Sequence, residues 1–303
     1  QSGTFSYLRL ENLLRKTLIT SETIFHMKLD PFIIIMTKNL KEFMPKDYLS
    51  RSSDLLLQSK GEILIVSGFY ILNSKSPETD GPPGAVAISN ALNNIGIKTS
   101  FVTDNYSYKV MKALAGDTEV INFPITSHRE SALFSENLLN SKDIGGILSI
   151  ERAGLLSDGT YRNWKGEDFS KYNAKIDHLF ELHPNTIGIG DGGNEIGMGN
   201  LKEIIPNIKN LPKDPCITTA KELIIASCSN WGGYGLVADI SIKKGVNLLP
   251  SVNEALNLVE KSVKFGAVEG MSGDSKNWVD GRSPEDDSVC LKDLIRLVES
   301  NIY

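Results

Sequence analysis

Residues 190–200 read Gly190-Asp191-Gly192-Gly193-Asn194-Glu195-Ile196-Gly197-Met198-Gly199-Asn200. Five of these eleven residues are glycine, which is more than one tight turn requires. The apolar run at 186–189 predicts a buried strand before this segment, and residues 201–205 predict the start of a helix after it. In α/β proteins, a glycine-rich turn between a strand and a helix brings backbone N–H groups and side chains to ligands. The segment therefore predicts an α/β fold with a ligand site, whereas the plainer alternative is a turn with solvent-exposed acids.

Predicted strands and helices alternate on both sides of this segment. Ile63-Leu64-Ile65-Val66 is a short apolar run, typical of a strand buried on both faces of a parallel sheet. Further strands are predicted at 98–102, 119–123, 146–150 and 222–227, and helices at 83–94, 106–115, 129–140, 171–182, from 231 onward, at 251–266 and around 291–298. Ser251 and Glu254 predict a capping box at the start of the 251–266 helix. The alternation predicts an α/β fold with a mostly parallel, doubly wound sheet and helices on both faces.

The chain has 303 residues, enough for one large α/β domain or two smaller ones. We predict a helical N-terminal extension at 1–60, which could serve as a contact in a homo-oligomer, and an α/β catalytic domain at 61–303. With 41% hydrophobic and 23% charged residues, the composition is that of a soluble globular protein. The net charge of -5 argues against a nucleic-acid partner, and no apolar run approaches the roughly 18 residues of a membrane span.

The cysteines and the N-terminal sequence bear on the compartment. The three cysteines lie far apart and form no Cys-x-x-Cys pair, so a reducing compartment is expected. No signal peptide is visible in the sequence. We therefore predict a cytoplasmic protein, with the mitochondrial matrix as the alternative if a targeting segment has been removed.

Polar side chains follow the predicted strands at the point where each strand ends. They are Glu78 and Asp80 after the first strand, Asp104 after the second, Glu151 and Arg152 after the strand at 146–150, Asp191, Asn194 and Glu195 after the strand at 186–189, and Asn230 after the strand at 222–227. The carboxyl ends of parallel strands share one edge, where open α/β sheets bind their ligands. We therefore expect these side chains to form one site, although chain order alone does not give the spatial order of the strands.

Several acids at one edge would repel one another. Two like charges 4 Å apart cost on the order of 4 kcal/mol at an effective dielectric constant near 20. A hard divalent cation, Mn²⁺ or Mg²⁺, would relieve that repulsion and suits carboxylate and amide oxygens. The alternative is that the acids cap helices or pair with Arg152 or Lys202, and capping is an equal expectation for Asp80. For Glu195 a role as metal ligand or general base is favoured.

Arg152 admits two interpretations. Its guanidinium could bind the carboxylate of an amino-acid or organic-acid substrate in bidentate fashion, or it could form a structural ion pair with a neighbouring acid. Two nucleotide motifs are set aside. The segment 188–193 formally matches G-x-G-x-x-G, but its first glycines fall within the predicted strand and an acid in the turn would repel a pyrophosphate. No P-loop motif occurs in the sequence.

Several segments resemble the cyclase domain of the D-glutamate cyclase family. They are Glu78-Thr79-Asp80-Gly81-Pro82-Pro83-Gly84-Ala85, Glu151-Arg152-Ala153-Gly154, the segment 190–199, Ser229-Asn230-Trp231-Gly232 and Val279-Asp280-Gly281. The likeness extends from about Ile63 to Asp280 and includes the order of the motifs. The resemblance implies a lyase that converts D-glutamate to 5-oxo-D-proline with loss of water, aided by Mn²⁺ or Mg²⁺.

With this resemblance, the candidate residues receive hypothetical roles. The metal ligands would be Glu78, Asp80, Glu151 and Asp191. The catalytic residues would be Glu195, Asn194 and Arg152, with Glu195 taking the amine proton. The substrate would be bound by Arg152, which would hold the α-carboxylate, and by Gly192, Gly193 and Asn230. Two alternatives remain open. One is another metal-dependent hydrolase or lyase acting on a small acid, and the other is a non-catalytic sensor of an amino acid or nucleotide.

Overall fold

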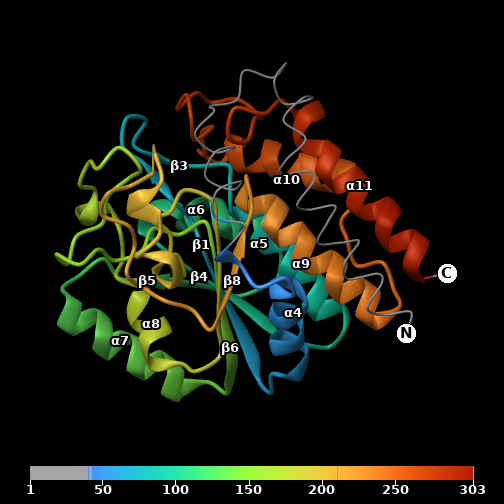
Figure 1. The fold of residues 1–303 in the computed structure, drawn as a ribbon, viewed down its shortest axis with the longest axis horizontal. Helices are drawn as coiled ribbons and strands as arrows, with labels where there is room; N and C mark the ends of the chain where they lie inside the picture. Colours follow the sequence, from blue (N-terminus) through green and yellow to red (C-terminus); the bar gives the residue numbers. More distant parts are fainter. Residues whose placement is uncertain (1–39, 41–42, 210, 303) are drawn as a thin grey trace.

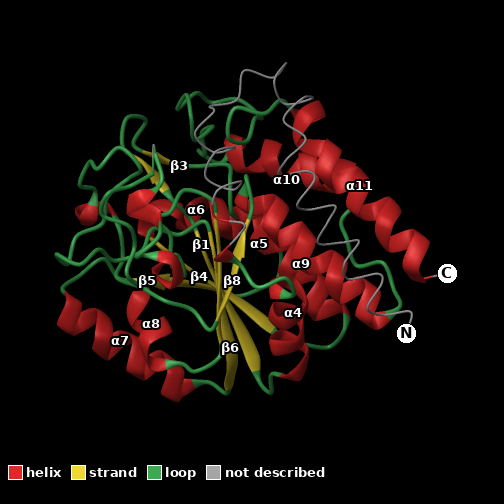
Figure 2. Cartoon of the chain, viewed as in Figure 1, coloured by secondary structure: helices red, strands yellow, loops and turns green. Residues whose placement is uncertain are grey.

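The computed structural model describes residues 40, 43–209 and 211–302, and its centre is a parallel β-sheet (Figures 1 and 2). Within these residues the sheet contains β1 (Glu62–Ser67), β4 (Thr99–Asp104), β5 (Val120–Phe123), β6 (Ile144–Ile150), β7 (Thr186–Gly190) and β8 (Glu222–Ile225), in the order β5-β4-β1-β6-β7-β8. All neighbouring strands in this sheet are parallel. A small antiparallel hairpin, β2 (Tyr70–Ile71) and β3 (Ser76–Pro77), follows β1.

The strand order reverses between β1 and β6. From β1 the chain moves outward to β4 and β5, and it then returns to the other side of β1 to build β6, β7 and β8. Ser67 at the end of β1 is paired with Ile150 at the end of β6, so both strands finish at the same level. The crevice outside the carboxyl ends of two such strands is where open α/β sheets bind ligands.

Helices cover both faces of the sheet, which confirms the predicted fold class. One face carries α4 (Tyr48–Gln58), α5 (Pro82–Asn94), α6 (Asn105–Leu114), α9 (Ser229–Lys244), α10 (Val252–Lys264) and α11 (Pro284–Ile302), and the other carries α7 (His128–Ser141) and α8 (Asp177–Leu182) (Figure 1). Side chains alternate across β1: Ile63 and Ile65 pack into the core that includes α9, whereas Leu64 and Val66 pack toward α7 and α8. This two-sided burial explains the continuous apolar run of β1.

Helices α5 and α9 touch through glycines, and this contact positions the site. A Cβ on Gly84 would lie 3.0 Å from the Cα of Asn230, and one on Gly233 would lie 3.3 Å from the Cα of Gly84. Because neither helix has a side chain at the crossing, their backbones approach closely at their first turns. The two N-termini therefore lie together beside the ends of β1 and β6.

Two predicted helices differ from the structure. The segment 171–182 contains a 3₁₀ turn, η3 (Ser170–Tyr172), and becomes α-helical only at Asp177, because the backbone of Ala174 bonds to Asp104 and Arg152 instead of to a helical turn. The helix predicted from 201 is replaced by two 3₁₀ turns, η4 (Gly199–Leu201) and η5 (Ile205–Asn207), the second of which contains Pro206, a residue without an N–H. The predicted capping box of Ser251 and Glu254 is confirmed at the start of α10.

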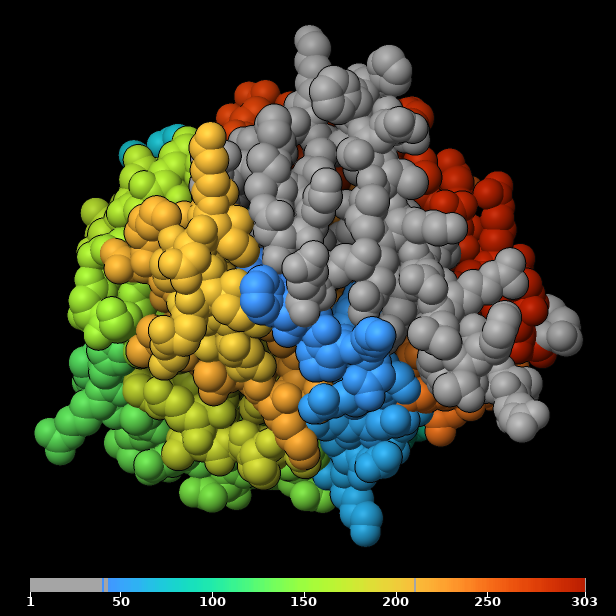
Figure 3. All heavy atoms as spheres, viewed as in Figure 1, coloured from blue at the N-terminus to red at the C-terminus, as the bar shows by residue number. Residues whose placement is uncertain are grey.

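Part of the predicted extension at 1–60 lies outside the described residues, and α4 represents the rest. Leu49 and Leu56 of α4 are buried in the same core as α9. Arg51 forms an ion pair of 2.9 Å with Glu222 of β8. Figure 3 shows the blue residues of this part of the chain on the surface, next to orange ones. Within the described residues, none of the helices has the length and apolar character needed to cross a membrane.

Candidate active site

Six acidic side chains converge at the carboxyl edge of the sheet, outside β1, β6 and β7. They are Glu78, Asp80, Glu151, Asp191, Glu195 and Asp280, and all six are buried. Carboxylate oxygens of Asp80, Glu151 and Asp191 all lie within 4.8 Å of one another. The structure thus brings together five of the acids that the sequence placed after the strands and adds Asp280, which was not predicted. Asp104, which was expected at the same site, caps α6 and pairs with Arg152 instead. We call these six residues the acid cluster.

Asp80 is fixed by the N-terminus of α9. Its Oδ2 accepts the N–H of Ser229 at 2.7 Å, and its Oδ1 accepts the N–H of Asn230 at 2.8 Å. These N–H groups have no partner inside their own helix, and the positive end of the helix dipole favours a carboxylate. The sequence suggested that Asp80 could cap the helix that follows it; instead Gly81, with φ of 94°, is the N-cap residue of α5, and Asp80 caps α9.

Glu151 and Asp280 both have backbone conformations in the left-handed region, with φ of 47° and 46°. Residues other than glycine seldom adopt this conformation, and they do so mainly at functional sites. Glu151 follows directly on β6, and Ser229 donates its hydroxyl to Oε2 of Glu151 at 2.5 Å. The chain therefore turns sharply at both residues and presents their carboxylates to the cluster.

The glycine-rich turn after β7 is organised around Glu195. The carboxylate of Glu195 accepts the backbone N–H groups of Asp191 at 3.3 Å, Gly193 at 2.7 Å, and Gly192. A Cβ on Gly192 would lie 2.7 Å from Oε1 of Glu195, so this position suits glycine. The N–H groups of Gly192 and Gly193, which were expected to bind substrate, thus already have an acceptor within the turn.

Arg152 and Asn230 are engaged elsewhere in the protein. The fully buried guanidinium of Arg152 contacts Asp104 Oδ2 at 2.7 Å and donates to the carbonyls of Gly68 at 3.0 Å and Ala174 at 2.9 Å. Asn230 accepts the N–H groups of Gly81 at 3.0 Å and Gly84 at 2.8 Å, and so fixes the start of α5. Neither residue lines the cavity described below, so both serve to position the site, and Arg152 has the structural ion pair that was its alternative.

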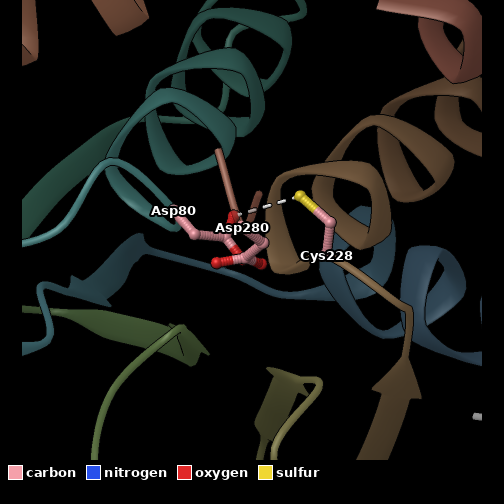
Figure 4. Close-up of side chains that lie close together, drawn as sticks. All are labelled: Asp80, Cys228 and Asp280. Atoms are coloured by element: carbon pink, nitrogen blue, oxygen red, sulfur yellow. Dashed lines mark hydrogen bonds between the residues drawn. The ribbon is translucent and has the colours of Figure 1, made fainter. Parts of the chain in front are cut away.

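Two residues that the sequence analysis missed complete the surroundings of Asp80. Asp280 and Cys228 offer an oxygen and a sulfur that lie within 4.8 Å of each other and of Asp80 (Figure 4). The thiol of Cys228 lies 3.4 Å from Oδ1 of Asp80. In the sequence, Asp280 was indicated only by the motif Val279-Asp280-Gly281. No pattern indicated Cys228, because a single cysteine before a helix is most often a core residue.

The loop that carries Asp280 is held by a second buried acid, Glu269. Its carboxylate accepts the N–H groups of Met271 at 2.8 Å, Ser272 at 2.8 Å and Gly281 at 2.7 Å. Burial raises the pKa of Glu269, but the hydrogen bonds from Ser272 and these backbone groups outweigh it and leave the pKa below its usual value. An ionised Glu269 thus fastens residue 281, next to Asp280, to the 269–272 turn.

Burial and mutual repulsion dominate the electrostatics of the acid cluster. The pKa values of Glu78, Glu151, Asp191 and Asp280 are all raised well above their usual range, first by burial and then by neighbouring carboxylates. Burial also raises the pKa of Glu195, whereas its backbone hydrogen bonds oppose that increase. A cluster of this kind holds its charge only when a cation accompanies it.

Five acids of the cluster, all except Asp80, line one cavity of about 900 Å³, counting its open mouth. The other walls come from the segments 69–73, 163–167 and 270–273, and they carry the aromatic side chains Phe69, Tyr70 and Trp164. Asn194 also lines the cavity, and its amide donates to the carbonyl of Arg162 at 3.0 Å.

The donor atoms of the cluster fit a divalent cation. Oε1 of Glu78 is buried and has no hydrogen-bond partner among the described residues. Oδ2 of Asp280 is also buried without a hydrogen bond, and it forms an ion pair of 3.7 Å with the guanidinium of Arg282. A buried acceptor left without a partner costs about 1–3 kcal/mol, more if charged, unless something else satisfies it. Carboxylate oxygens are the ligands that Mg²⁺ and Mn²⁺ prefer, so the unpartnered oxygen of Glu78 fits such an ion.

Comparison with known proteins shows the family of the chain. The family described as D-glutamate cyclase-like, C-terminal, matches residues 26–295. A curated human protein, D-glutamate cyclase, mitochondrial, is 29% identical over 225 residues, which are 68% of this chain and 36% of the human protein. The chain thus spans about a third of the length of that relative.

A solved structure of an exopolyphosphatase-related protein from Bacteroides fragilis covers 85% of this chain and 57% of its own, with a TM-score of 0.41 and 9% sequence identity. The family match includes every residue of the acid cluster and confirms the resemblance that the motifs suggested. The chain therefore belongs to the D-glutamate cyclase-like family.

Proposed function

We propose that this protein is a lyase that converts D-glutamate to 5-oxo-D-proline and water. The observation that carries the proposal is the acid cluster, five of whose side chains line one cavity, with a buried oxygen of Glu78 left without a hydrogen-bond partner among the described residues. Family membership supports the same reaction, since the human relative is named D-glutamate cyclase. The name of that relative also supports the mitochondrial alternative of the two compartments expected from the sequence.

The reaction makes one bond and breaks another within a single molecule. The α-amino nitrogen forms a bond to the carbon of the side-chain carboxyl group, and one carbon–oxygen bond of that group breaks. The nitrogen gives up two protons in all, and the departing oxygen takes up two and leaves as water. Holding the substrate folded, with these atoms in contact, can supply about 7–11 kcal/mol of the barrier. A cavity with aromatic walls suits this task, because it restricts the number of conformations that the bound amino acid can adopt.

The ammonium group must lose a proton before it can attack, and we assign that proton to Glu195. Its Oε1 accepts two backbone N–H groups and its Oε2 accepts one, so one lone pair of Oε2 remains. The three bonds hold the carboxylate in place at the cavity wall. A general base needs this combination of fixed position and an available acceptor site.

Glu78, Asp80, Glu151 and Asp191 would hold Mn²⁺ or Mg²⁺, with Asp280 as a further ligand candidate. When bound, such an ion supplies Lewis-acid polarisation to the carboxyl group of a substrate. Asp80 contributes a carboxylate already stabilised by the N-terminus of α9, and Glu151 contributes one oriented by Ser229. The positions of these side chains are thus fixed by helix and strand ends.

The test is to incubate the protein with D-glutamate or L-glutamate, with and without Mn²⁺, and to follow 5-oxoproline by mass spectrometry. We expect product from D-glutamate and a higher rate with Mn²⁺. Glu195→Gln should abolish turnover while metal content stays near that of the wild type, and Glu260→Gln, an exposed site on α10, is the matched control. Product from neither enantiomer would refute the proposal, and binding of glutamate without turnover would favour a sensor.

A further inference from the structure

We propose that Lys165 forms the subsite for the α-carboxylate of the substrate, an assignment that rests on the proposed function. The groups expected to bind this carboxylate are not available. Arg152 is paired with Asp104 away from the cavity, Asn230 holds the start of α5, and the N–H groups of Gly192 and Gly193 bond to Glu195. Another group must therefore bind the second carboxylate of glutamate.

Lys165 is the cationic side chain among the described residues that line the cavity. The same cavity contains the carboxylates of five members of the acid cluster and that of Glu167. Oε2 of Glu167 accepts the amide of Asn163 at 2.6 Å, and no ion pair joins Lys165 to any described acid. The ammonium of Lys165 is thus the positive charge that the described cavity wall presents to an anionic ligand.

A tight turn holds Lys165 at this position. The N–H of Asn163 donates to the carbonyl of Glu167 at 3.1 Å, and the N–H of Gly166 donates to the carbonyl of Asn163 at 2.8 Å. Oδ1 of Asn163 accepts the backbone N–H groups of Lys165 and Glu167, each at 3.0 Å. These four bonds close the segment 163–167 on itself, so the backbone of Lys165 is fixed although its side chain reaches solvent.

The ammonium is also placed by an aromatic ring. Nζ of Lys165 lies 5.1 Å from the ring centroid of Trp164, which lines the same cavity. This distance lies within the roughly 6 Å over which a cation is attracted to an indole face. The contact favours side-chain conformations in which the ammonium stays near the cavity wall.

The charge pattern matches a folded glutamate. The side-chain carboxyl group and the amine are the reacting groups and belong at the acid cluster with its cation. The α-carboxylate takes no part in bond formation, and it would be repelled by the acids wherever it was not paired. A lysine ammonium is a compact point charge that can bind one carboxylate without the planar geometry that an arginine requires.

The test compares D-glutamate with its α-carboxamide analogue, in which the α-carboxylate is neutral. We expect Lys165→Met to raise KM for D-glutamate by roughly fivefold, the scale of an exposed ion pair, and to leave kcat within about twofold. In this variant, the ratio of the KM for the analogue to the KM for D-glutamate should fall by the same factor. Lys165→Arg should restore most of the KM ratio of the wild type. Lys171 lies outside the cavity, so Lys171→Met should give the wild-type KM values.

The subsite is overturned if the ratio of KM values for the two ligands is the same in Lys165→Met and in the wild type. Failure of the proposed function gives a different result, because D-glutamate then yields no product even with the wild-type protein. In that case calorimetric affinities for D-glutamate and the analogue replace KM in the same comparison. An unchanged affinity ratio in Lys165→Met overturns the subsite, and a reduced ratio supports it.

Discussion

The substitution Glu78→Gln separates two effects of charge in the acid cluster, namely repulsion between carboxylates and binding of a cation. Oε1 of Glu78 is buried and has no hydrogen-bond partner among the described residues, so the substitution removes no hydrogen bond at that atom. The neighbours that repel the Glu78 carboxylate include Asp280, Asp80 and Asp191. Without metal, the variant should therefore be at least as stable as the wild type. The repulsion of one such pair at 4 Å and an effective dielectric constant near 20, on the order of 4 kcal/mol, sets the scale of the gain.

With metal the order of stability should change. Mn²⁺ at 100 times its dissociation constant adds about 2.7 kcal/mol to the wild-type stability. At about 2 °C per kcal/mol, the lower end of the range for large domains, this raises Tm by roughly 5 °C. If loss of one ligand weakens binding about 100-fold, the same Mn²⁺ concentration adds only about 0.4 kcal/mol to the variant, or roughly 1 °C.

The assay is thermal unfolding of EDTA-treated protein, followed by circular dichroism during titration with Mn²⁺. Glu260→Gln removes one acid from the exposed face of α10 and serves as the control, with a wild-type response. An equal Tm increase in Glu78→Gln and the wild type would remove Glu78 from the metal site. A wild-type Tm that does not respond to Mn²⁺ or Mg²⁺ would contradict the cation site itself.

Three further predictions follow from buried contacts. Arg152→Met should destabilise the protein by about 3–5 kcal/mol in urea unfolding, because it leaves the buried Asp104 carboxylate without its cation. A change mainly in KM would instead indicate that Arg152 binds the substrate. Gly188→Ala should cost about 1–3 kcal/mol, because its Cβ would lie 2.6 Å from the carbonyl oxygen of Ile196, and an unchanged midpoint would contradict that packing. Burial raises the pKa of Asp287 from 3.8 to about 6, so the folded state holds this proton more tightly than the unfolded state and the contribution of Asp287 to stability falls as pH rises through this window. Asp287→Asn keeps an acceptor for the indole N–H of Trp231. In urea unfolding, the variant should be more stable than the wild type by up to about 3 kcal/mol at pH 7.5, and by little near pH 4. A difference in stability that is independent of pH would refute this prediction.

Local sequence was sufficient for most of the fold. The apolar runs of β1, β6 and β7 predict buried strands because a parallel strand covered on both faces has no polar position to fill. The capping box of Ser251 and Glu254 is also visible in sequence, since both partners belong to one helical turn. Prediction was wrong where a distant partner competed with a local pattern, as at Ala174, whose backbone bonds to Asp104 and Arg152.

The sequence by itself determined which residues follow the strands, and parallel strands bring those residues to one edge; the convergence of Asp80, Glu151 and Asp191 follows from that rule. Only the tertiary structure decided what each group does there. It paired Arg152 with Asp104, directed the glycine N–H groups to Glu195, and brought Asp280 to the cluster on a loop held by Glu269. The physical reason is that strand and helix patterns arise from neighbours in the chain, whereas a buried charge or donor bonds to whichever partner the packed fold brings within about 3 Å.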